Sequence, residues 1–186
     1  HLLEYDRVMN EQREIIYGER RKVLEGDNLR DNVIKMVKEI VESAVNIHTG
    51  DSPHPDDWDI VALRDYLVKI IPIQGIEITE EEREDLTKEG LKEKLTNQAI
   101  KLYEQKEQEI GEEQIREIER VILLRVIDQK WMDHIDNMDQ MRQGIGLRAY
   151  GQRDPLVEYQ FTGYDMFEEM SNNIQEDTIR ALYHVK

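Results

Sequence analysis

Apolar residues recur every three or four positions through the last third of this sequence, in two runs separated by a short basic segment. The first run comprises Ile118, Val121, Leu124, Ile127, Trp131, Ile135, Met138 and Met141. The second comprises Tyr164, Phe167, Met170, Ile174, Ala181, Leu182 and Val185. This spacing places apolar side chains on one face of an α-helix. Two such helices joined by a short turn are predicted to form an antiparallel hairpin, each burying its stripe against the other.

The same spacing continues through residues 2–25, where no proline interrupts it, and predicts a long amphipathic helix. Gly26 is expected to end this helix and Asp27 to cap the next one. Residues 48–59 hold a glycine, two prolines and four acids and are expected to form a loop. The sequence therefore predicts an all-α fold with one long helix, a helical insertion and the two-helix hairpin.

Two places in the insertion leave the local structure open. Residues 72–78 alternate in a way that fits a short extended piece, and Thr79 with Glu82 then forms a capping box for the next helix. Gly111 lies within a predicted helical run, and the sequence leaves open whether it breaks that run.

The composition excludes several classes of protein. The chain carries 41 Asp and Glu against 25 Lys and Arg, a formal net charge of −16, which argues against nucleic acid as the main partner. The absence of cysteine excludes disulfides, thiolate zinc sites and thiol catalysis. No apolar run approaches the length of a membrane span. The sequence begins in helical register without a methionine, as expected for a piece of a longer protein.

Motifs of catalysis and metal binding are weak. The letters GIGLRA fit a dinucleotide-binding fingerprint, but that fingerprint needs a preceding strand, whereas a helix is predicted there. Several acids and a histidine crowd residues 128–139, where helical spacing spreads them around the cylinder, so a solvated acidic side is expected. Trp131 and Met132 are expected to belong to the core. The sequence therefore predicts no catalytic residue, no metal site and no cofactor in this chain.

The basic segment between the two runs is the strongest candidate for a functional site. Residues 141–153 contain three arginines, three glycines and one tyrosine but no acid. Gly144 and Gly146 are expected to end the first helix, and Asp154 and Pro155 to begin the second. A tyrosine among arginines at a loop tip is typical of a contact surface, although a merely solvated tip would accommodate the same residues.

Three segments carry a resemblance to a known family: LLEYDRVMNEQREIIYGER, VILLRVIDQKWMDHIDNMDQMRQGIGLRAYGQRDPLVEYQ and GYDMFEEM. They resemble the bacterial preprotein translocase ATPase SecA family, in its helical scaffold and helical wing domains. The resemblance covers nearly all 186 residues and is most specific over residues 1–30 and 119–170. It implies a scaffold helix at residues 1–26, a helical wing at 27–108 and a two-helix finger at 109–186.

The resemblance also implies a function for the basic segment. Proteins of this family hydrolyse ATP and drive unfolded secretory preproteins through the SecY channel. Tyr150 falls at the position of the family's fingertip aromatic residue, and Arg148 and Arg142 lie in the same neighbourhood, facing preprotein or channel. Nothing in the chain resembles the nucleotide-binding motifs, so ATP and magnesium are expected in other domains.

The expected partners follow from the same resemblance. They are the SecY channel, the unfolded preprotein, and the nucleotide-binding and preprotein cross-linking domains of the same longer protein. The expected location is the cytoplasm, peripherally on the cytoplasmic face of the cell membrane. The alternative function is a pure interaction or assembly module without substrate contact, with possible self-association through the exposed stripe of residues 2–25.

Overall fold

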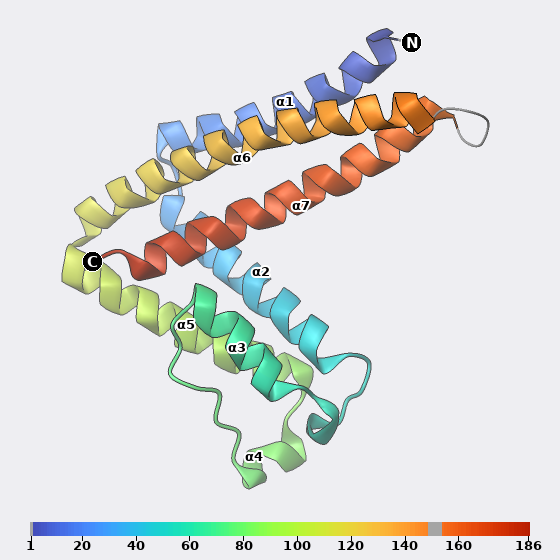
Figure 1. Ribbon diagram of the computed structural model, residues 1–186. Helices are drawn as coiled ribbons and strands as arrows, with labels where there is room; N and C mark the ends of the chain where they lie inside the picture. The colour runs from blue at the N-terminus through green and yellow to red at the C-terminus, as the bar shows by residue number, and fades with distance from the viewer. Residues whose placement is uncertain (1, 149–153) are drawn as a thin grey trace. The chain divides into compact units, whose positions relative to one another are not determined.

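The computed structural model describes residues 2–148 and 154–186, and within them the chain is all-helical with no strand, as predicted (Figure 1). The elements are α1 (Leu2–Glu25), α2 (Leu29–Thr49), the 3-10 turn η1 (Pro55–Asp57), α3 (Ile60–Ile70), α4 (Glu80–Asp85), α5 (Lys88–Ile110), α6 (Glu112–Arg148) and α7 (Pro155–His184). The chain forms two compact units. Unit 1 comprises His1–Asp27 and Arg120–Ile174, and unit 2 comprises Asn28–Glu119 and Gln175–Lys186. Helices α6 and α7 therefore contribute residues to both units.

Unit 1 is built from α1, most of α6 and the first two thirds of α7. Helices α6 and α7 run antiparallel, because His134 lies beside Phe167 while Met138, one turn later, lies beside Gly163. A Cβ atom at Gly163 would come within 2.8 Å of Met138 Cε, so the missing side chain is what permits this close approach. A small cluster of Met138, Ile145 and Tyr159 forms the core at one end, with Tyr5, Val8, Met9, Met141 and Met166 packed on it. The predicted hairpin is confirmed.

The buried face of α6 in unit 1 differs in part from the predicted stripe. Ile127, Trp131 and Met138 are buried as predicted, whereas Val121 is 44% exposed and its neighbour Leu123 is buried instead. On α7, Tyr164 was predicted to be buried but is 62% exposed. Helix α6 packs against α1 as well as α7, and a face shared by two partners need not follow the most apolar line of the helix.

Two further expectations for α6 are wrong. Met132 is 66% exposed rather than part of the core. His134 is buried rather than on a solvated acidic side, because it has a hydrogen-bond partner on α1. Periodicity of apolar residues identifies neither case, since one depends on the neighbouring helix and the other on a polar partner distant in sequence.

The helix ends correct two other expectations and agree with a third. Asn28, not Asp27, is the N-cap residue of α2, and it adopts the left-handed conformation with φ of 57°. Helix α6 continues through Gly144 and Gly146 to Arg148, so these glycines do not end it. A glycine costs a helix only about 1 kcal/mol, and burial of Ile145 between the two glycines favours the helical turn. Helix α7 starts as predicted, with Asp154 Oδ1 accepting a hydrogen bond from Leu156 N at 3.0 Å.

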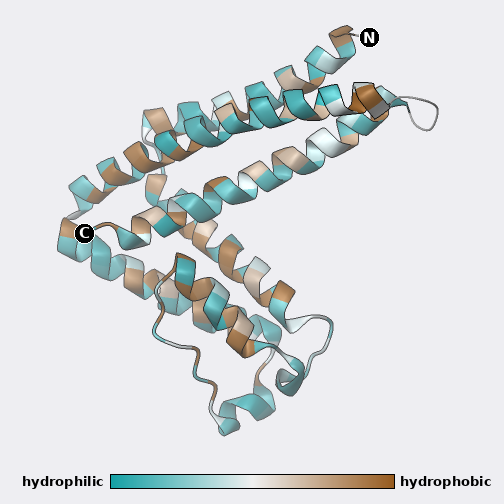
Figure 2. Cartoon of the chain, in the orientation of Figure 1, coloured by the Kyte–Doolittle hydropathy of each residue, from teal (hydrophilic) through white to brown (hydrophobic). Residues whose placement is uncertain are grey.

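Unit 2 has a core of aliphatic side chains in which α2 packs against α3 and α5. Its fully buried residues include Val33, Val37, Val41, Ala44, Val45, Leu63, Leu67, Leu91, Leu95 and Tyr103. Thr79 Oγ1 accepts from Glu82 N at 3.2 Å, so the predicted capping box forms, and hydropathy colouring shows the acidic α4 as hydrophilic (Figure 2). Gly111 does interrupt the helical run: it ends α5 with φ of 99°.

Candidate functional site

Of the basic segment predicted from the sequence, residues 141–148 form the last turns of α6. Tyr150 falls outside the described residues, and Arg148 is the last residue of α6. Arg142 is held within unit 1 by α1: its guanidinium lies 4.5 Å from the centre of the Tyr5 ring, and Nη1 is 3.7 Å from Asp6 Oδ1. The spacing of apolar residues does not predict this contact, because it depends on where α1 packs.

The Tyr5 ring links Arg142 to the core of the hairpin. It lies 5.0 Å from the ring of Tyr159 on α7 at a tilt of 58°, an arrangement favourable for two aromatic rings. Burial raises the pKa of Tyr159, while the nearby Arg142 opposes the shift. The phenol of Tyr159 therefore stays protonated at neutral pH. The contact between Arg142 and the Tyr5 ring attaches α1 to the last turns of α6.

Apolar side chains are exposed close to the tip. Leu147, in the last turn of α6, is 84% exposed, and the end of α6 is coloured as hydrophobic (Figure 2). Phe161 is exposed on α7, and Leu2 and Leu3 are exposed on α1. Large exposed apolar groups that gather at one end of a helical unit indicate an interaction surface.

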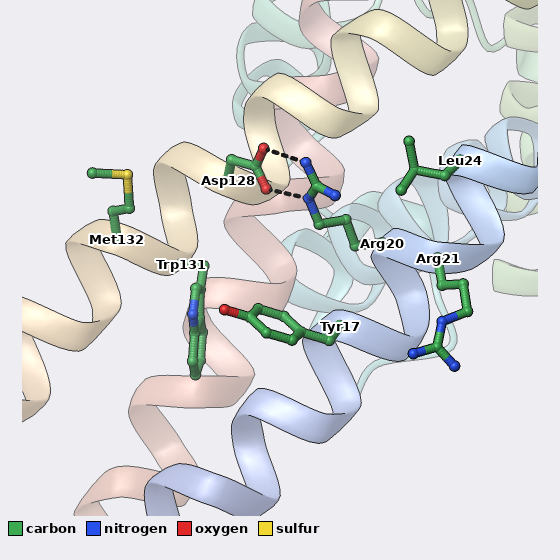
Figure 3. A pocket seen from close by; sticks show the side chains of 7 residues that line it. All are labelled: Tyr17, Arg20, Arg21, Leu24, Asp128, Trp131 and Met132. Carbon is green, nitrogen blue, oxygen red and sulfur yellow. Dashed lines mark hydrogen bonds and ion pairs between the residues drawn. The ribbon is translucent and has the colours of Figure 1, made fainter.

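A second candidate site is a groove between α1 and α6 in unit 1, with a volume of about 530 Å³. Its lining residues are Tyr17, Arg20, Arg21, Leu24, Asp128, Trp131 and Met132 (Figure 3). Tyr17, Leu24 and Met132 supply exposed apolar surface. The size lies in the range of grooves that bind small molecules or a few side chains of a partner.

One wall of the groove is fixed by an ion pair. Arg20 Nε lies 2.7 Å from Asp128 Oδ1 and its Nη2 lies 3.1 Å from Oδ2, the bidentate geometry that suits a guanidinium and a carboxylate (Figure 3). The hydrogen bonds that Arg20 donates to Asp128 raise the pKa of Arg20. Because this pair is neutral overall, Arg21, to which the described residues offer no ion pair, leaves the groove positively charged.

The floor of the groove carries an unsatisfied donor. Trp131 is buried, yet within the described part of the chain its indole Nε1 has no hydrogen-bond partner. The hydroxyl end of Tyr17 is directed toward Trp131 (Figure 3). A buried N–H without an acceptor is unfavourable.

One polar side chain of α1, Gln12, joins both helices of the hairpin. Gln12 Nε2 donates to the carbonyl oxygen of Gly163 at 3.1 Å, and its Oε1 lies 2.7 Å from His134 Nε2. Since a Gln Oε1 only accepts, His134 must carry a proton on Nε2. Burial lowers the pKa of His134, which keeps the imidazole neutral at pH 7. Gln12 thus holds α1, α6 and α7 at one level.

The described residues show neither a metal site nor a membrane span. Among side chains outside 1 and 148–153, no three His, Asp or Glu come together in a way that would hold a metal ion. None of the helices in the described part combines the length and the hydropathy that crossing a bilayer requires.

The fold and the groove define a class: an α-helical scaffold with exposed apolar surface. Residues 1–186 match the SecA Wing and Scaffold domain over the whole chain, so the chain belongs to that family. The predicted resemblance is confirmed.

Individual relatives agree with this assignment. The chain is 54% identical over 184 residues to the protein translocase subunit SecA of Caldicellulosiruptor saccharolyticus, covering 99% of this chain and 21% of the relative. It is 55% identical over 187 residues to the same subunit of Lachnoclostridium phytofermentans, covering 100% of this chain and 22% of the relative. The chain therefore spans about a fifth of the length of these relatives.

Proposed function

We propose that this chain is the wing and scaffold region of a protein translocase subunit, which connects an ATP-driven motor to a polypeptide that crosses a membrane. The observation that carries the proposal is the match of all 186 residues to the SecA wing and scaffold family, together with relatives named as translocase subunits. ATP and magnesium would bind in nucleotide-binding domains of the longer protein. The chain itself would act by contact and by mechanical support.

The proposed contact with substrate is the tip of the α6–α7 hairpin. Tyr150 would touch the unfolded preprotein, with Arg148 and Arg142 facing preprotein or the SecY channel. The absence of acids from residues 141–153 and the 84% exposure of Leu147 support a contact surface there. Because Arg142 already contacts Tyr5 and Asp6, its proposed role includes holding α1 beside the base of the tip.

The test of the tip is Tyr150→Ala in the full-length translocase subunit, with preprotein transport as the assay. Transport should fall while helix content and thermal unfolding stay unchanged, and a bulky apolar residue at position 150 should do less harm. The matched control is Tyr164→Ala, because Tyr164 is an exposed tyrosine on α7 outside the proposed tip. Transport by Tyr150→Ala at the wild-type rate would show that the tip assignment is wrong.

The proposed contact with the motor is the outer face of α1 and the groove beside it. Ile15, Tyr17 and Leu24 are exposed apolar residues on α1, and Arg21 gives the groove its positive charge. A motor segment with an acidic side chain next to apolar ones would satisfy this surface. Leu24→Asp in the full-length subunit should then uncouple ATP hydrolysis from transport, and normal coupling in that variant would contradict the proposal.

The alternative is an assembly module that does not touch substrate. The exposed apolar residues of α1 also favour it, since such a surface can associate with a second copy. Sedimentation of the 186-residue chain over a concentration series tests self-association. A cross-linker placed at position 150 of the intact subunit separates the two functions: adducts with channel loops but never with preprotein would favour the assembly module.

Two coarser features complete the proposal. The division into a scaffold helix at 1–26, a wing at 27–108 and a two-helix finger at 109–186 stays a prediction from the family. The longer protein would work in the cytoplasm and associate peripherally with the cytoplasmic face of the membrane, through the channel rather than through this acidic chain.

A further inference from the structure

Inside unit 2, charged side chains form a chain of alternating sign around the elbow between α5 and α6. Gly111 makes the elbow, with φ of 99°, and α6 begins at the next residue. At the outer end, Arg30 Nε of α2 lies 3.1 Å from each of the two carboxylate oxygens of Glu107 on α5. These contacts attach α2 to α5 immediately before the elbow.

The chain of charges continues across the elbow into α6. Arg116 Nη2 donates to Glu107, and Arg116 Nη1 lies 2.7 Å and 2.8 Å from the two carboxylate oxygens of Glu119. The Glu119 side chain has no exposed surface. A carboxylate is stable in such a place only while its charge partners stay in position. The beginning of α6 is therefore fixed to α5 by an interaction that is costly to disturb.

Tyr103 connects this chain of charges to α7. It is fully buried on α5, its hydroxyl donates to Glu119 Oε2, and its ring lies 5.5 Å from the ring of Tyr183 near the end of α7. Tyr183 in turn donates its hydroxyl to the carbonyl oxygen of Ala99 at 2.8 Å. Burial, and next the hydrogen bond to Glu119, raise the pKa of Tyr103, so its phenol remains a donor.

We propose that Tyr103 is a positioning residue that couples the beginning of α6 to the end of α7 within unit 2. Its ring lies against the Tyr183 ring in a tilted arrangement, while its hydroxyl donates to Glu119. Because ring and hydroxyl belong to one rigid group, a shift of Glu119 displaces the surface on which Tyr183 rests. The beginning of α6 and the end of α7 are thus held together within unit 2. This role is separate from the contact proposed for the tip.

The test is amide hydrogen exchange on the 186-residue chain, with Glu119→Gln in two backgrounds. Glu119→Gln keeps the shape but removes the charge, and it should raise exchange at residues 178–184 by about threefold relative to the amides of α3. In a Tyr103→Phe background, where the ring remains and the hydroxyl is absent, the same change should leave exchange at 178–184 nearly unaltered. The matched control for loss of a phenol hydroxyl is Tyr17→Phe, which lies in unit 1.

Exchange at residues 178–184 in the two backgrounds decides whether Tyr103 couples the helices. An equal rise at residues 178–184 in both backgrounds, or no rise in either, would overturn the coupling through Tyr103. If Glu119→Gln fails to fold, Arg30→Gln disturbs the same series of charged contacts at its half-exposed outer end. Exchange at residues 178–184 is then measured for Arg30→Gln with Tyr103 intact and with Tyr103→Phe. No transport assay enters this test, so it is independent of the fate of the proposed function.

Discussion

Replacement of Gln12 by leucine tests how strongly one polar side chain holds the three helices of unit 1 together. Gln12 is 7% exposed and makes both of its hydrogen bonds across helix boundaries, to Gly163 O and to His134 Nε2. Leucine has a similar size but no donor or acceptor. The carbonyl of Gly163 lies inside α7, but the buried N–H of His134 loses its partner on α1.

The magnitude follows from that unpaired donor. A buried polar group without a partner costs about 1–3 kcal/mol, and burial of the leucine side chain offsets part of this cost. We therefore expect Gln12→Leu to lower the free energy of unfolding by about 1–2 kcal/mol, which corresponds to about 2–8 °C in Tm for a chain of this length. The double variant Gln12→Leu, His134→Leu should be less destabilised than the sum of its single variants, because neither partner remains to be left unpaired.

Tryptophan fluorescence reports on this change separately in each unit. Trp131 is buried in unit 1 and Trp58 in unit 2, so urea unfolding in a Trp58→Phe background follows unit 1 alone. The control is Gln140→Leu, the same replacement at an exposed site on α6. The reasoning fails if Gln12→Leu and Gln140→Leu unfold at the same urea concentration, or if the two single effects simply add in the double variant.

Three further predictions concern unit 1. Gly163→Ala should lower the free energy of unfolding by about 1 kcal/mol, since overpacking against Met138 costs about 1–3 kcal/mol and the better helix former returns about 1 kcal/mol; an unchanged urea midpoint would contradict this. Because burial lowers the pKa of His134, its stabilising effect should be complete above the unfolded value of about 6.5 and disappear as the pH falls toward the folded value. The difference in unfolding free energy between wild type and His134→Gln measures it, and a difference independent of pH would refute it. Arg20→Gln should shift the urea midpoint less than Gln12→Leu and not at all in high salt, because its ion pair with Asp128 is exposed to solvent.

The helical class and the hairpin could be predicted because the apolar spacing of α6 and α7 is regular over many turns. The exact faces could not be, and Val121 and Tyr164 are exposed for that reason. The buried places are taken partly by polar residues such as His134, whose partner Gln12 is far away in sequence. A pattern of apolar residues carries no information about such pairs.

The candidate sites also divide into features that the sequence predicts and features that depend on how the helices pack. Composition identified the acid-free segment 141–153, and the assignment of Tyr150 stays a prediction because that residue lies outside the described ones. The attachment of Arg142 to Tyr5 and the groove beside Trp131 both depend on where α1 packs. Local sequence does not contain that placement, so these features emerge only from the three-dimensional arrangement.

The close approach at Gly163 has a mechanical consequence for the hairpin. Gly163 is the single glycine of α7, so sliding α7 along α6 by one turn, about 5.4 Å, would bring Tyr159 or Phe167 to the level of Met138. A larger side chain at that level would have to displace the side chain of Met138. A push along the hairpin axis would accordingly be carried as compression of both rods, without slippage of one past the other.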